Sequence, residues 1–168
     1  MGATDSTKKV RFEADGITTA TTRVVTVPDR DVTIGPTLGT MQTGTGSETA
    51  FAYTSLPAGI RRITISFVGL SLSGTDNILV QIGDTNGVSA TGYVSSGGGI
   101  ANSGASTVVS STAGFIVLAA NSASVSSGAM ILNLVNPATF LWSASFAGKA
   151  NATGTLMGGG DKALAAVL

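Results

Sequence analysis

The feature that most constrains this fold is a long segment without any charged side chain. The sixty-four residues from Thr85 to Gly148 are mainly Ser, Thr, Gly, Ala and aliphatic residues. Soluble proteins ordinarily spread Lys and Glu over their surfaces, because charged residues are the least often buried. A segment without them must hide much of its surface or meet water through small hydroxyl groups. Such a composition is typical of subunits in tightly packed assemblies.

Small and β-branched residues dominate the chain as a whole. Of its 168 residues, 23 are Gly and 42 are Ser or Thr. These residue types favour turns and short strands, and long helical repeats of Leu, Glu and Lys are absent. We therefore predict an all-β protein, in which a short N-terminal β segment precedes a β-sandwich or jelly-roll-like domain.

The residue types that are missing exclude several functions. The chain has no His and no Cys, which excludes a Ser-His or Cys-His nucleophile, a disulfide and a thiolate metal site within one chain. Nine basic and nine acidic residues give a net charge of zero, so no basic face for nucleic acid is expected. No apolar run reaches the ~18 residues of a membrane helix. We expect no enzymatic activity, no cofactor, no bound metal and no membrane insertion.

The charged residues gather near the N-terminus. Ten of the eighteen lie within the first 31 residues. Alternating apolar residues and turn dipeptides predict three short strands there, at residues 9–13, 23–27 and 31–34. Strands this short expose too little apolar area to be stable alone, so we expect them to pack on identical copies or on a docking surface.

This change in composition predicts the domain boundaries. Residues 1–36 form the N-terminal β segment, residues 37–48 a Gly- and Thr-rich linker, and residues 49–168 the β-sandwich. The predicted strands of the sandwich are Thr49–Thr54, Ile60–Leu70, Ile78–Ile82, Ser89–Val94, Thr107–Ser111, Gly114–Leu118, Ala129–Val135, Thr139–Phe146 and Thr153–Met157. Many short strands at this spacing indicate a sandwich or jelly roll.

Two glycine-rich stretches are interpreted as turns. Ser95–Gly99 contains one Gly triplet, and Gly158–Gly160 is another. Neither is followed by a helix start and the Lys-Ser or Lys-Thr pair of a phosphate-binding loop. Flexible connections are therefore the preferred interpretation.

A surface that binds a glycan would combine an aromatic ring with polar loop groups. Tyr93, beside the predicted Ser95–Gly99 loop, is the candidate ring, and Asp84 and Asn86 are the candidate polar groups. Core packing is the alternative for aromatic residues, and it is preferred for Phe140 and Trp142. An Asx turn is the preferred interpretation of the acidic and amide residues in these turns, over calcium binding.

Apolar residues on both faces of a strand predict contact between copies of the chain. The candidate oligomer-interface residues are Val10, Phe12, Val25, Val27, Ile131 and Leu134. Arg61 and Arg62 are adjacent and must face opposite ways on a strand. One is expected to point to solvent, and the other to pair with an acidic residue or to reach a neighbouring subunit.

Two parts of the chain resemble modules of tailed-bacteriophage fibre and virion proteins. The first, from Asp5 to Asp29, reads DSTKKVRFEADGITTATTRVVTVPD. The second, from Ser55 to Asp84, reads SLPAGIRRITISFVGLSLSGTDNILVQIGD, and it continues in STAGFIVL, NPATFLWSASF and GGGDKALAAVL. The resemblance covers most of the chain and names a structural family rather than a chemistry. It implies a virion protein, assembled in the host bacterial cytoplasm, that forms a fibre-like homotrimer.

The resemblance leaves three roles open: a tail-fibre or head-fibre subunit, a capsid decoration protein, and a receptor-binding module for a host-surface glycan or protein. Other virion proteins are expected partners. In the family, further strands rich in Arg, Thr and Asp would follow KALAAVL, Lys162–Leu168. We therefore expect either that a strand continues in a longer gene product or that this terminus is tucked against neighbouring structure.

Overall fold

The computed structural model describes residues 16, 18–24, 36–46, 48–117, 124–150 and 154–168. The chain divides into two compact units, Met1–Met41 and Gln42–Leu168, and this boundary falls inside the predicted linker. The described residues of the first unit form no strand, and they include a turn in which the Thr21 amide donates to the Thr18 carbonyl (3.0 Å). The N-terminal strands predicted at residues 9–13, 23–27 and 31–34 lie wholly or mostly outside the described residues.

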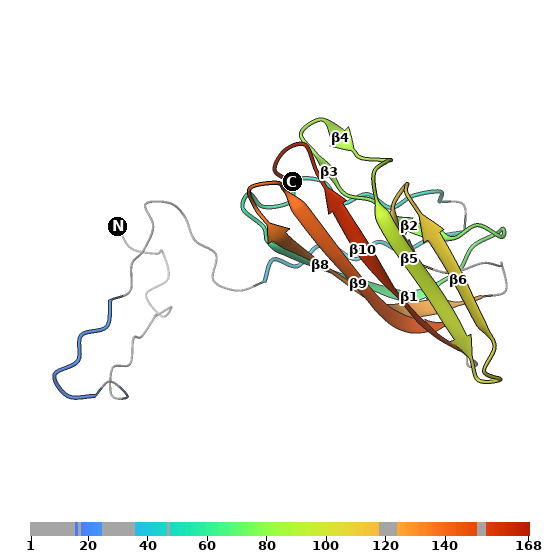
Figure 1. Cartoon of the computed structure of the whole chain (residues 1–168), viewed down its shortest axis with the longest axis horizontal. Coiled ribbons are helices and arrows are strands. Elements are labelled where there is room, and N and C mark those ends of the chain that lie inside the picture. Colours follow the sequence, from blue (N-terminus) through green and yellow to red (C-terminus); the bar gives the residue numbers. More distant parts are fainter. Residues whose placement is uncertain (1–15, 17, 25–35, 47, 118–123, 151–153) are drawn as a thin grey trace. The chain divides into compact units, whose positions relative to one another are not determined.

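The second unit is built on one broad antiparallel sheet, whose strand order is β1-β8-β9-β10-β5-β6 (Figure 1). Its strands are β1 (Arg62–Leu70), β5 (Val94–Ala101), β6 (Ser106–Ser111), β8 (Ser126–Asn136), β9 (Leu141–Ala150) and β10 (Gly154–Ala163). Two small antiparallel sheets accompany it: β2 (Ile78–Val80) with β7 (Phe115–Val117), and β3 (Gly83–Asp84) with β4 (Gly87–Val88). The described residues contain no helix, and the all-β prediction is confirmed.

Alternation along each strand separates the two faces of the broad sheet. In β1, Ile63, Ile65 and Phe67 pack against the core, while Thr64 and Ser66 between them are exposed. The same period continues across the sheet and gives one inner, apolar face. The buried core residues are Ile82, Tyr93, Phe115, Val117, Met130, Leu132, Trp142, Ala144, Phe146, Leu156 and Leu164.

Glycines on the inner face make room for the aromatic contact between β1 and β9. Gly128 and Gly148 are direct cross-strand partners. A Cβ atom on Gly128 would lie 3.1 Å from the Phe146 ring, and one on Gly148 would lie 2.9 Å from it. The ring therefore covers the backbone of both strands, and Phe67 meets it edge-to-face with the ring centroids 6.1 Å apart.

The small β2–β7 sheet packs on the inner face through β7, which contacts β5, β6 and β10. The Ile116 carbonyl would be 3.2 Å from a Cβ atom on Gly97. The Ser95 hydroxyl accepts a hydrogen bond from the Ile116 amide (2.9 Å) and donates one to the Gly159 carbonyl (3.2 Å). A jelly roll divides eight strands between two sheets. Here one layer has six strands and the layer containing β7 has two.

Four sequence interpretations in this unit are wrong. Thr49–Thr54 forms no strand, and Ser89–Val94 contributes only Val94 to β5. Ser95–Gly99 lies within β5 and Gly158–Gly160 within β10, and the two stretches pair with each other, Gly97 opposite Gly158. Glycine is depleted in strands unless another backbone approaches closely. That exception holds here, because a Cβ atom on Gly158 would lie 2.8 Å from the Ser96 carbonyl oxygen.

Tyr93 joins the segment after β2 to the broad sheet. Its hydroxyl accepts a hydrogen bond from the Ile82 amide (2.8 Å) and lies within donating distance of the Ile82 and Ser89 carbonyls (3.1 and 3.0 Å). Its ring meets Phe115 edge-to-face at 5.0 Å. The Lys162 ammonium lies 5.2 Å from the ring centroid and donates to the Thr91 carbonyl (2.8 Å).

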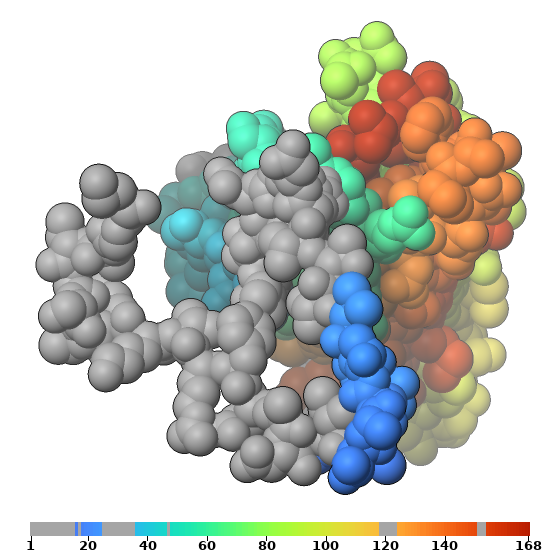
Figure 2. Space-filling model, turned by 90° about the vertical axis from the view of Figure 1, so that its left-hand side faces the viewer, coloured from blue at the N-terminus to red at the C-terminus, as the bar shows by residue number. Residues whose placement is uncertain are grey.

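The C-terminal residues lie between the β3–β4 hairpin and the β8–β9 connection (Figure 2). The Leu164 amide donates to the Phe140 carbonyl (3.2 Å), and the Ala166 amide donates to an Asp84 carboxylate oxygen (3.1 Å). Leu164 and Leu168 add apolar contacts to the core. This end of the described chain is therefore held by hydrogen bonds to two separate connections.

The Tyr93 hydroxyl gives a direct test of this packing. We expect Tyr93→Phe to lower the free energy of unfolding by about 1–3 kcal/mol, because the buried Ile82 amide loses its partner. Urea unfolding of the purified chain measures the change. Tyr53→Phe is the matched control, because Tyr53 is 50% exposed whereas Tyr93 is 1% exposed. Equal stabilities of the two variants would contradict the assigned role.

Candidate interaction surface

The outer face of the broad sheet carries two neighbouring rows of uncharged side chains that cross all six strands. The first row, from β1 to β6, is Thr64, Ile131, Ser145, Gly159, Ser96 and Ser110. The second row is Ser66, Ala129, Ala147, Met157, Gly98 and Val108. None of the twelve residues is buried. The center of this face, which we call the outer rows, is therefore accessible, uncharged and made mostly of small residues.

Charged residues on this face stand only at its borders. Arg62 and Asp161 belong to the row beside Thr64, on β1 and β10 respectively, and Lys149 belongs to the row on the opposite border. Three strand spacings separate Arg62 from Asp161, which is about 14 Å and too far for an ion pair within one chain. All three side chains are exposed.

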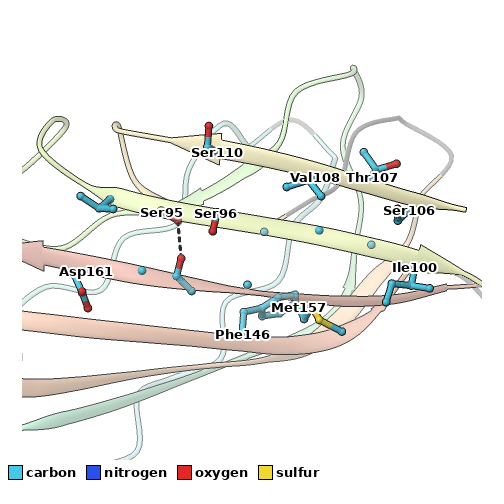
Figure 3. A pocket seen from close by; sticks show the side chains of 17 residues that line it. Ser95, Ser96, Ile100, Ser106, Thr107, Val108, Ser110, Phe146, Met157 and Asp161 are labelled. Atoms are coloured by element: carbon cyan, nitrogen blue, oxygen red, sulfur yellow. Dashed lines mark hydrogen bonds between the residues drawn. The ribbon is translucent and has the colours of Figure 1, made fainter.

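A shallow groove occupies the part of this face over β10, β5 and β6, with a volume of about 890 Å³ (Figure 3). Backbone atoms of Gly98 and Gly159 form part of the groove floor, and Ser96 contributes a small hydroxyl side chain. Val94 and Val108, which are 76% and 78% exposed, are among the apolar residues around the floor. Glycine is required at the floor, because a Cβ atom on Gly98 would lie 2.7 Å from the Thr107 carbonyl oxygen.

The structure does not place the Tyr93 ring where a glycan could stack on it. The prediction assumed a loop at residues 95–99. These residues belong to β5 instead, and the Tyr93 side chain, which directly precedes this strand, is buried in the core. Burial raises the pKa of the Tyr93 phenol, opposed in part by its hydrogen bond from the Ile82 backbone. The surface position expected for Tyr93 is therefore wrong.

Asp84 ends β3, and Asn86 lies in the turn that connects β3 to β4. One carboxylate oxygen of Asp84 accepts a hydrogen bond from the Asn86 amide (2.8 Å), as in an Asx turn, and the other accepts from the Ala166 amide. These hydrogen bonds lower the pKa of the Asp84 carboxyl below its usual value, and the bond from the Asn86 amide has the largest effect. Both carboxylate oxygens therefore have partners within the chain.

The candidate interface residues fall into three groups. Ile131 lies in the outer rows and is half-buried. Leu134 is half-buried and packs against the core of its own chain. Val10, Phe12, Val25 and Val27 lie outside the described residues.

Sequence reasoning missed the residues of the groove. Gly98, Gly159 and Met157 belong to stretches that were assigned to turns or to the end of a strand. The available signal was the period-two spacing of Val94, Ser96, Gly98 and Ile100, in which two bulky apolar residues bracket two small ones. A run of Gly and Ser interrupts this pattern and hides it.

The acidic side chains of the described residues are scattered. These residues contain no group of three or more Asp and Glu side chains placed to hold a metal ion. Asp161 is the one charged residue that lines the groove. Within the same residues, we find no helix of the length and apolarity that would cross a membrane.

Comparisons with known proteins give no match: no family model, no curated protein and no solved structure matches this chain.

The Asp84 carboxylate makes the C-terminal contact depend on pH. Its pKa is lowered in the folded chain, so its contribution is complete above the ordinary value of 3.8 and is lost as the pH falls through the lower folded value. We expect Asp84→Ala to speed hydrogen exchange of the Ala166 amide at neutral pH. Asp76→Ala, at an exposed site, is the control and should leave this amide unchanged. Unaltered exchange in Asp84→Ala would show that the contact does not form.

Proposed function

We propose that this chain is a structural subunit of a bacteriophage virion and that it assembles as a homotrimer within a tail or head fibre. The observation that carries the proposal is the outer face, six strands wide, whose outer rows carry no charge, in a protein with only eighteen charged residues. Exposed apolar groups rimmed by polar ones mark interaction sites on soluble proteins, and Met157 and Val108 are exposed apolar residues among the hydroxyls of this face. A subunit that covers this face with its neighbours needs no charge there.

The resemblance to phage fibre and virion modules supports the viral part of the proposal. The sequence segments that carry the resemblance include strands of the broad sheet. Ser55–Asp84 contains β1, and the segment that begins at Gly158 contains the second half of β10. A structural role also agrees with the groove, where a single carboxylate stands without a second acid or base. Assembly through shared sheet faces is the mechanism we assign.

Sedimentation of the purified full chain tests self-assembly. We expect one species of three times 16.6 kDa, about 50 kDa, at micromolar concentration. Equilibrium sedimentation across a dilution series measures the mass and the association constant. A folded monomer throughout the series would contradict the proposal, because the uncharged face would then be stable in water without a partner.

Immunogold labelling of intact phage particles tests the location. We expect a few sites on a fibre-like projection. Uniform labelling of the shell would indicate a capsid decoration protein instead, and absence from the particle would overturn the viral assignment. A shift on host-surface glycan arrays would indicate a receptor-binding module.

A further inference from the structure

We propose that the outer face is the contact between copies, with the β1–β8 side of one copy seated on the groove over β10, β5 and β6 of the next. This inference rests on the proposed function, because it names the surface through which that oligomer forms. The occupant is a second copy of this chain, related by rotation about an axis along the strands. Each copy then uses two different halves of the same face.

The size of the face sets how much surface a ring of copies would cover. Six strands at ~4.8 Å are about 29 Å wide, and the seven residues of β9 from Ser143 to Lys149, which join the two border rows, are about 23 Å long. The product is about 670 Å², which each copy would cover in total over its two contacts. Each single contact is therefore smaller than the ~800 Å² per partner of a standard interface, and the closed ring is needed to cover the whole face.

The two halves of the face have complementary shapes. The β1–β8 half carries two apolar residues, Ile131, which is half-buried, and Val68, which is 88% exposed and forms the raised part of this half. The β10–β5 half is hollowed at Gly98 and Gly159. In a ring, each contact packs the β1–β8 half of one copy on the hollowed half of the next. A twofold pair about an axis along the strands would make the same contact twice, so the mass in equilibrium sedimentation distinguishes the two arrangements.

The border charges fit the same arrangement. Arg62 stands on the raised half and Asp161 on the hollowed half, in one row. In a ring whose strands run along the axis, rows of neighbouring copies lie at the same height. The Arg62 guanidinium of one copy then faces the Asp161 carboxylate of the next. Within the part of the chain that the structure describes, neither side chain has a partner of opposite charge, since their own separation is about 14 Å.

The composition of the face favours a copy of the chain over a glycan. None of the twelve residues in the outer rows is aromatic, so the face has no ring for a sugar to stack on. Ser and Thr hydroxyls at five of these positions can each donate and accept, and they can hydrogen-bond with one another when two such surfaces meet.

The decisive experiment introduces a charge at the center of the face. Ala147 lies on β9 in the outer rows and is exposed, so Ala147→Arg should leave the fold intact. We expect it to abolish the trimer in equilibrium sedimentation, because an unpaired guanidinium would be buried between copies. Val88→Arg is the matched control, since Val88 is exposed but lies on the β3–β4 hairpin. It should sediment as the unaltered chain does, and circular dichroism reports the fold of both.

Charge exchange tests the orientation without relying on that variant. Arg62→Asp and Asp161→Arg should each weaken association at least about tenfold, and the double variant should recover most of the loss.

If the unaltered chain and Ala147→Arg are both trimers, the inference is overturned while the proposed function stands. If the unaltered chain is a monomer, the proposed function itself fails. Single variants that match the unaltered chain, or a double variant no better than the singles, would overturn the seating of one half on the other.

Discussion

The whole sheet depends on the close approach of β5 and β10. This pairing joins β5 and β6 to the four strands that complete the sheet, and it runs through opposed glycines such as Gly97 and Gly158. The strands approach so closely that a Cβ atom on Gly158 would lie 2.9 Å from the Gly97 Cα atom. Glycine costs conformational entropy in a strand. That cost is offset here by backbone hydrogen bonds that no larger residue would permit.

The same glycines shape both faces of the sheet. On the inner side, Gly97 lets the backbone of β7 lie directly against β5, and Ser95 satisfies the Ile116 amide there. On the outer side, Gly98 and Gly159 hollow the surface into the groove. A substitution that filled one face would therefore disturb the strand pairing that supports the other. The core and the interaction surface are consequences of one backbone geometry.

How far the sequence predicts this fold depends on which residues mark each strand. The alternation of Ile63, Ile65 and Phe67 predicted β1. β-Branched and aromatic residues favour a strand, and their period of two indicates which face of the strand is buried. The Gly and Ser runs of β5 and the Gly run of β10 were interpreted as turns. Glycine is needed at these positions because the two strands pair closely with each other, and this pairing joins segments that are distant in the sequence. Tyr93 was misplaced for the same cause. The sequence named Ile131 as an interface candidate, and the strand register places it on the outer face. The residues of the groove could be found only from the register of β5 with β10.

Small hydroxyl residues suit a surface that is exposed before assembly and covered afterwards. A face of Leu and Ile would associate with any apolar surface, whereas Ser and Thr keep the free chain hydrated and lose little when they pair with hydroxyls of a neighbour. Specificity must then come from shape and from the few charges, since the hydroxyls themselves accept many partners. In the assembly that we propose, those features are the groove floor at Gly98 and Gly159, the exposed Val68, and the opposite signs of Arg62 and Asp161. If the chain assembles as we propose, the scarcity of charge in the sequence gives each border charge more weight in selecting the partner.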